Sequence, residues 1–168
     1  KSTGITFNYV ISNGSNLFSL PGKVEAGNSN CNSSEWTMFE YVKESNSFKK
    51  VTQPLPGKAY WIYNPGKSCE AKVTIKNALG LGDLEKLTPK WNFVAIVPEM
   101  IGKKISNMGD CDLAAAFTYN SASRKWENVI DKEINKSYLG KAFAVYSNNE
   151  CKLGNNSAEP GIPVLPDI

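Results

Sequence analysis

The chain has 168 residues, of which 41% are hydrophobic and 21% are charged, a composition typical of folded globular domains that excludes disordered and collagen-like chains. A net charge of +3 with a single arginine, Arg124, does not indicate a surface for phosphates or nucleic acid. Histidine is absent, which removes the usual general base and the commonest metal ligand and argues against most classes of enzyme.

The first predicted element is a strand over residues 5–11, where large apolar residues alternate with small or polar ones before a turn at residues 12–14. We expect residues 1–15 to form an N-terminal strand that stands outside the repeated part of the chain. No apolar run has the length of a membrane span, and the opening residues do not resemble a signal peptide. We therefore expect a soluble chain that has already been trimmed.

An internal repeat follows this strand. In each copy, an apolar strand ended by proline precedes an aromatic strand, a turn rich in Ser and Asn, a second strand, and a strand introduced by Gly-Lys. The matching segments are residues 16–21 with 91–98, 39–51 with 117–129, and 57–63 with 140–146. The sequence therefore predicts a duplication of about eighty residues per unit.

The predicted organisation places repeat one at residues 16–77 and repeat two at residues 91–154. Residues 78–90 form a linker in which residues 81–87 are the best helical candidate, because Gly and Asp can cap a turn and Thr-Pro ends it. Residues 155–168 carry three prolines and are interpreted as an extended tail, either a strap or a linker.

The fold class follows from these elements. Short strands with apolar alternation are separated throughout by clusters of Asn, Ser, Gly and Pro. We predict an all-β protein of two tandem, homologous, antiparallel units, each sandwich- or barrel-like and the two packed as one rigid body.

The four cysteines fall at matching positions of the two repeats, since Cys31 corresponds to Cys111 and Cys69 to Cys151. Of the three connectivities open to four cysteines, this register favours Cys31 with Cys69 and Cys111 with Cys151. Free thiols and a zinc site are the alternatives, although zinc ligands usually come as close pairs such as C-x-x-C. Disulfides imply an oxidising compartment, so we expect an extracellular or cell-surface location.

Several motifs in the two units resemble the GWNL…PGKGYW repeats of prokaryotic secreted and cell-surface proteins. The motifs are Trp-Asn-Phe-Val at residues 91–94, Pro-Gly-Lys-Ala-Tyr-Trp at 56–61 and Leu-Gly-Lys-Ala-Phe at 139–143. The likeness covers residues 16–154, with Ser15 in place of the tryptophan in repeat one, and Ala59 and Ala142 in place of a glycine. The resemblance implies an extracellular β module and carries no catalytic residues with it.

Comparison of the repeats separates shared positions from differing ones. Tyr60 and Ile62 match Phe143 and Val145 on one face of a strand, so we expect these four residues in the core. Trp126 matches a phenylalanine of repeat one and is interpreted as scaffold.

Repeat one carries two tryptophans where repeat two has alanine, because Trp36 corresponds to Ala114 and Trp61 to Ala144. With Tyr63, these tryptophans are predicted to form an aromatic platform that stacks on sugar rings or anchors a protein partner. The alternative is that the same faces pack between the repeats, where large residues meet small ones.

Acidic residues offer weaker candidate sites. Asp110 and Asp112 flank Cys111 and suggest calcium, but no EF-hand spacing follows and turn chemistry accounts for them, so we predict no metal and no cofactor. A glycosidase needs a pair of carboxylates, and no motif of the sequence singles one out. The pairs that could be chosen are Asp131 with Glu133 and Asp83 with Glu85.

These observations favour a non-catalytic module for recognition or adhesion, with a surface glycan or protein as its ligand and Trp36, Trp61 and Tyr63 as the binding residues. We expect such a module to neighbour other domains or subunits of a surface assembly, such as the head of a pilus or a surface layer. A structural spacer and a carboxylate-based glycan hydrolase are the rival functions. A weak groove for single-stranded DNA, with Lys49, Lys50 and Lys58 beside Trp61, is a further alternative.

Overall fold

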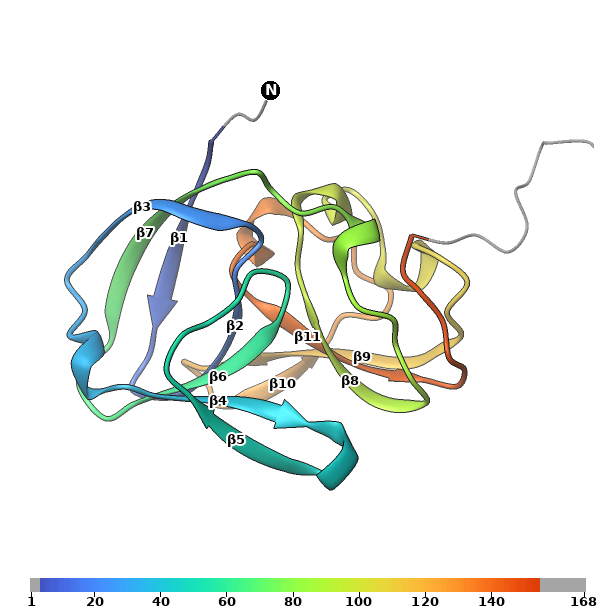
Figure 1. Ribbon diagram of the computed structural model, residues 1–168, viewed down its shortest axis with the longest axis horizontal. Coiled ribbons are helices and arrows are strands. Elements are labelled where there is room, and N and C mark those ends of the chain that lie inside the picture. The colour runs from blue at the N-terminus through green and yellow to red at the C-terminus, as the bar shows by residue number, and fades with distance from the viewer. Residues whose placement is uncertain (1–3, 155–168) are drawn as a thin grey trace, which may run out of the picture.

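The computed structural model describes residues 4–154 and is all-β, as predicted, with three antiparallel sheets (Figure 1). The tail 155–168, predicted to be an extended strap, lies outside the described residues. Each sheet is an open set of strands with two edges, so the barrel-like alternative within the predicted sandwich- or barrel-like units is wrong.

A three-stranded sheet has the order β1-β7-β3 and contains the predicted N-terminal strand. That strand, β1 (Ile5–Ile11), has the bounds predicted from its alternation. Its partner β7 (Cys69–Lys76) lies in the middle and also pairs with β3 (Lys23–Ser29), whose side chains are all exposed. The two ends of residues 5–76 therefore meet in one sheet.

The two four-stranded sheets have the same strand order, which we describe as the first and the second sheet. The first sheet has the order β2-β6-β4-β5, built from β2 (Gly14–Ser19), β6 (Ala59–Asn64), β4 (Thr37–Val42) and β5 (Ser47–Val51). The second has the order β8-β11-β9-β10, built from β8 (Lys90–Ala95), β11 (Ala142–Ser147), β9 (Leu113–Asn120) and β10 (Lys125–Asn128).

The strand registers also correspond between these sheets. Trp61 lies opposite Phe39 in the first sheet, and Ala144 lies opposite Phe117 in the second. Tyr41 pairs with Phe48 as Tyr119 pairs with Trp126; the aligned segments of the sequence therefore occupy corresponding places in the two sheets.

An asparagine closes the turn before the first strand of each four-stranded sheet in the same way. Asn16 Oδ1 accepts a hydrogen bond from the Ser12 N–H at 2.8 Å, and its Nδ2 donates back to the Ser12 carbonyl at 2.9 Å. Asn92 makes the same pair of bonds with Thr88, at 3.1 and 2.8 Å. Each amide thereby satisfies backbone groups that the turn leaves unpaired.

Both predicted disulfides are present. Cys31–Cys69 joins the segment after β3 to the start of β7, and Cys111–Cys151 joins the segment before β9 to the last described residues. The predicted pairing of Cys31 with Cys69 and of Cys111 with Cys151 is confirmed.

Short 3-10 turns connect the strands. The helix predicted over residues 81–87 is reduced to the single turn Leu81–Asp83, because Leu87 instead pairs with Cys151 as an isolated β-bridge and Leu84 is buried. The other 3-10 turns are η1 (Ser33–Glu35), η2 (Lys43–Ser45), η4 (Pro98–Met100), η5 (Ile105–Asn107) and η6 (Lys136–Tyr138).

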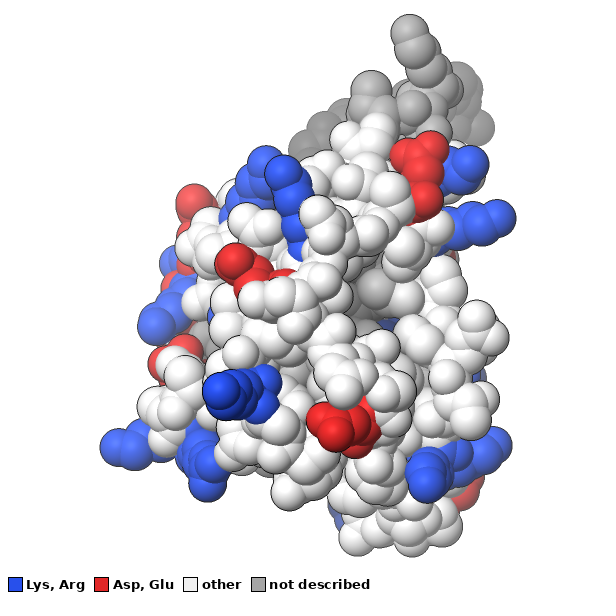
Figure 2. Space-filling view, turned by 90° about the vertical axis from the view of Figure 1, so that its left-hand side faces the viewer, with Lys and Arg blue, Asp and Glu red and all other residues white. Residues whose placement is uncertain are grey.

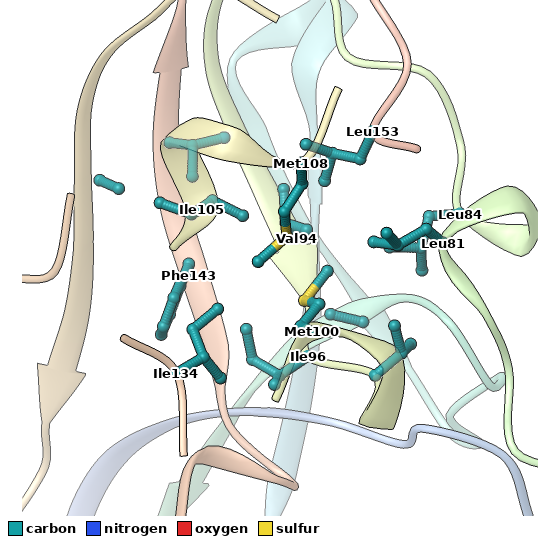
Figure 3. Close-up of a cluster of buried hydrophobic side chains, with 14 of the residues drawn as sticks. Leu81, Leu84, Val94, Ile96, Met100, Ile105, Met108, Ile134, Phe143 and Leu153 are labelled. Carbon is teal, nitrogen blue, oxygen red and sulfur yellow. The ribbon is translucent and has the colours of Figure 1, made fainter. Parts of the chain in front are cut away.

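The inner face of each four-stranded sheet forms a hydrophobic core, and the four core residues predicted from the repeat are all buried. The first sheet contributes to a small cluster of Ile11, Phe18, Tyr60 and Ile62. The second sheet contributes to a much larger cluster, in which side chains from β8, β11 and the connecting loops converge on Val94 and Met100 (Figure 3).

The two four-stranded sheets are joined where β2 ends. The Ser19 N–H donates to the Gly140 carbonyl at 2.9 Å, and Ser19 Oγ donates to the Lys141 carbonyl at 2.7 Å. The Tyr9 hydroxyl from β1 donates to the same Gly140 carbonyl, and burial raises the pKa of the Tyr9 phenol well above its usual range. Gly140 is required here, because its φ of +89° favours glycine and a Cβ would lie 2.8 Å from the Phe7 ring.

Charged side chains are dispersed over the surface. Figure 2 shows lysines and acidic residues interspersed on the side of the molecule that carries the three-stranded sheet. This mixture agrees with the near balance of 19 basic and 16 acidic residues.

Candidate functional site

The outer faces of the two four-stranded sheets are lined with aromatic side chains, because aromatic residues occupy alternate positions of their strands. We call this surface the aromatic face. Its residues are Phe39, Tyr41, Phe48, Trp61 and Tyr63 from the first sheet, and Trp91, Phe93, Phe117, Tyr119, Trp126 and Tyr146 from the second.

The aromatic face is exposed to an unusual degree. Four aromatic side chains among the described residues count as exposed, and all four belong to it: Phe48 at 56%, Tyr63 at 48%, Trp91 at 42% and Trp126 at 47%. Large rings held on a sheet surface contribute much of the binding energy of interfaces, at a low cost in conformational entropy. The face therefore has the composition of a binding surface.

Trp61 joins the two halves of the face. Its ring makes T-shaped contacts with Tyr119 at 5.3 Å, Trp126 at 5.8 Å and Phe93 at 6.2 Å between ring centroids, all in the second sheet. Tyr41 adds a fourth contact between the sheets, 5.3 Å from Phe93. The Trp61 Nε1–H is buried without a hydrogen-bond partner among the described residues, so ring packing rather than polar bonding holds the indole there.

Two apolar hollows lie at corresponding places on this face. The second-sheet hollow, of about 380 Å³, is lined by Trp91, Phe93, Phe117, Trp126 and Ala144. The first-sheet hollow, of about 370 Å³, is lined by Ser15, Phe39, Phe48 and Trp61. Four positions correspond between the hollows, but only the second-sheet hollow is walled by two tryptophans.

A polar groove of about 150 Å³ borders the second-sheet hollow, since Trp91 and Phe93 line both. Within the groove, Lys58 Nζ lies 3.3 Å from Glu40 Oε2 and 3.9 Å from Glu85 Oε1. The hydrogen bond to Glu40 raises the pKa of the Lys58 ammonium. The groove therefore presents a charge cluster beside an aromatic wall.

Lys43 lines the other part of the groove. Its Nζ donates to the Thr88 carbonyl at 3.1 Å and to Asn92 Oδ1 at 3.3 Å. Burial lowers the pKa of the Lys43 ammonium, with the nearby charge of Lys90 acting in the same direction and Glu44 opposing it. This lysine ties β8 to the turn after β4.

The structure separates the three residues predicted as a platform. Trp61 and Tyr63 alternate on β6 and share the aromatic face. Trp36 instead packs, half-buried, against the small cluster on the inner side of the first sheet. The tryptophan pair therefore does not form one platform.

Sequence comparison missed three of the four exposed rings of the aromatic face among the described residues. Trp126, interpreted as scaffold, is 47% exposed, because no element of residues 4–154 covers the outer face of β10. Trp91 and Phe48 were not singled out as binding residues, although their alternation with core residues could have indicated an outer face.

The acidic candidates take part in turns. Asp110 Oδ1 accepts from the Lys152 N–H at 3.2 Å, and Asp112 Oδ2 accepts from Asn148 Nδ2 at 3.2 Å. The Asp83 side chain accepts from the Gly80 N–H at 2.8 Å and closes the 3-10 turn η3 (Leu81–Asp83). Asp110 also lies near Cys111 and Cys151, but these sulfurs are bonded to each other and offer no thiolate for a metal.

Comparisons of the chain with models of protein families, with curated proteins and with solved structures give no match. Within residues 4–154, no helix is long and apolar enough to cross a membrane. The inference of function therefore depends on the geometry of this chain.

Proposed function

We propose that the protein is a non-catalytic recognition module that binds an extracellular glycan or surface protein through its aromatic face. The observation that carries this proposal is the gathering of all four exposed aromatic side chains of the described residues on that one face. Such a surface gains binding energy by covering its rings and loses little side-chain freedom in doing so.

The polar groove favours a glycan over a protein as the ligand. Sugar rings present C–H faces that stack on aromatic rings, and hydroxyl groups that need hydrogen-bonding partners. Trp91 and Phe93 supply the rings, and the Lys58, Glu40 and Asn92 side chains of the same groove supply polar groups. A protein ligand would instead be expected to cover both hollows.

The rival functions have less support. A pure spacer predicts a surface without exposed aromatic side chains, in contrast to the four on the aromatic face. A carboxylate hydrolase predicts two acidic side chains that face each other across an open cleft. The two carboxylates of the groove, Glu40 and Glu85, instead have the Lys58 ammonium between them.

We infer a secreted or surface-displayed protein from its two disulfides, which persist in oxidising compartments. Membership of the GWNL…PGKGYW repeats and a place in a pilus or other surface assembly are part of the same proposal. Both inferences are supported by the motifs at residues 56–61, 91–94 and 139–143.

We also propose that the chain is a tandem duplication of one β unit. It is supported by the common strand order, the matching asparagines Asn16 and Asn92, and one disulfide per unit. Ile11 pairs with Cys69 as Leu87 pairs with Cys151, which extends the likeness upstream of residues 16 and 91.

The test is a fluorescence titration of the oxidised protein with polysaccharides, peptidoglycan, a panel of surface proteins, and single- and double-stranded DNA. We expect saturable binding to a glycan that weakens at least tenfold in Trp91→Ala and in Lys58→Ala, because both residues line the polar groove. Leu55→Ala is the matched control, because Leu55 is as exposed as Phe48, at 56%, but lies off the aromatic face. Binding that survives both groove changes would contradict the proposal.

A further inference from the structure

The second-sheet hollow is too apolar to satisfy a polar ligand. Its lining consists of Trp91, Phe93, Phe117, Trp126 and Ala144, none of which offers a carbonyl, carboxylate or hydroxyl side chain. A glycan placed there would lose hydrogen bonds to water without replacement. The hollow therefore fits an occupant that presents apolar rings and few polar groups.

The chain contains such an occupant. Pro160, Pro163 and Pro166 recur every three residues in the C-terminal segment, separated by Gly-Ile and Val-Leu. In a polyproline II helix, which has three residues per turn, prolines at this sequence spacing share one edge, about 9 Å apart. Aromatic-lined grooves recognise P-x-x-P segments of this kind, because proline rings pack on aromatic rings and the conformation is preformed.

The point where the described chain ends is compatible with this contact. Cys151 pairs with Leu87, and Trp91 follows Leu87 by four residues along the same segment. Gly154, the last described residue, donates its N–H to the Met108 carbonyl at 2.6 Å. The twelve residues from Gly154 to Pro166 span up to about 40 Å when extended, which suffices to reach the wall formed by Trp91.

We propose that residues 160–166 of this chain bind the second-sheet hollow of their own molecule, with the prolines against Trp91 and Trp126. Attachment to the same chain gives the segment a high effective concentration at the hollow, so weak packing contacts are sufficient. The first-sheet hollow is the poorer site, because Ser15 and Phe48 replace the two tryptophans. The inference builds on the aromatic face as a binding surface, but its test uses only the chain itself and can fail separately from the ligand panel.

The experiment follows the indole N–H resonances of the ¹⁵N-labelled full chain, assigned with single Trp→Phe variants. The test variant carries Pro160→Ser, Pro163→Ser and Pro166→Ser together. We expect the Trp91 and Trp126 resonances to shift in this variant and the Trp36 resonance to stay, because Trp36 packs on the inner side of the first sheet. Val164→Ser, which changes an apolar residue off the proline edge, is the control and leaves all of them unchanged.

A peptide of residues 155–168, added to the triple variant, is expected to restore the two resonances and to saturate. Ala144→Trp, which fills the second-sheet hollow, weakens peptide binding at least tenfold, whereas Ser15→Trp, which fills the first-sheet hollow, does not. Identical Trp91 and Trp126 resonances in the wild-type chain and the triple variant would overturn the proposal. A shift that depends on protein concentration would overturn binding within one molecule.

Discussion

The two four-stranded sheets share strand order and register, but they differ in what covers them. The inner face of the first sheet packs against a small cluster that includes Ile11 of β1, next to the three-stranded sheet. Loops, 3-10 turns and the Phe7 and Ile75 side chains of the three-stranded sheet cover the inner face of the second, and together they make its core larger. The comparison teaches that two sheets with the same strand order can be covered by very different amounts of surrounding chain, provided that their inner apolar residues are buried.

The outer faces differ in a second way. Inner positions such as Tyr60 and Phe143 keep large apolar side chains in both sheets, because a packed core penalises a loss of volume. Several outer positions keep an aromatic residue in both sheets, but two differ strongly, with Trp61 against Ala144 and Ser15 against Trp91. These changes give two hollows of similar size different walls.

The largest effect is expected from a cavity in the larger core. Phe143→Ala should lower the free energy of unfolding by about 3–5 kcal/mol, because Phe143 is fully buried. Urea denaturation measures the change. Phe48→Ala, on the exposed outer face, is the control and should change stability by about 0.5 kcal/mol or less. A loss below about 1 kcal/mol for Phe143→Ala would contradict the assigned core.

The second-largest loss of stability is expected from removal of either disulfide. The two bonds close loops of similar length, with sequence separations of 38 and 40, so each should contribute about 2–4 kcal/mol. Replacement of Cys111 and Cys151 by Ser should cost more than replacement of Cys31 and Cys69, because Cys151 is buried in the larger core. Thermal unfolding of the two double variants tests this order; the reverse order would contradict it.

Replacement of the two turn asparagines should cost different amounts of stability, with the greater loss at the more buried residue. Asn16→Ala should cost about 1–3 kcal/mol, because it leaves the buried Ser12 N–H and carbonyl unpaired. Asn92→Ala removes the same bonds to Thr88 but should cost less, since Asn92 is only half-buried and water can replace it. Chemical denaturation of both variants measures the two losses in free energy of unfolding. Equal losses would contradict the expected influence of burial.

The smallest effect concerns the residue that begins β8. Lys90 has a φ of +80°, a left-handed conformation that costs a residue with a Cβ about 1–2 kcal/mol, whereas the corresponding Gly14 has a φ of +97°. Lys90→Gly should therefore stabilise the protein by up to about 1 kcal/mol. Gly14→Ala should destabilise it, as a matched control in the first sheet. Loss of stability in Lys90→Gly would show that the lysine side chain contributes more than the strain costs.

Much of the fold could be predicted from local patterns. Alternation along residues 5–11 predicts β1 with its correct bounds, because the side-chain period of a strand is visible in the sequence. The register of the cysteines predicts both disulfides. The helix over residues 81–87 could not be corrected locally, since Leu87 pairs with Cys151, 64 positions along the chain.

The sequence by itself determined which residues alternate, which cysteines pair and which aromatic positions differ between the two aligned segments of the chain. Only the tertiary structure decided that Trp36 lies inside the first sheet, that Trp61 meets three rings of the second, and that Trp126 stays exposed. The physical reason is that alternation defines two faces of a strand but not which face meets water. That choice is made by the packing of segments distant in sequence.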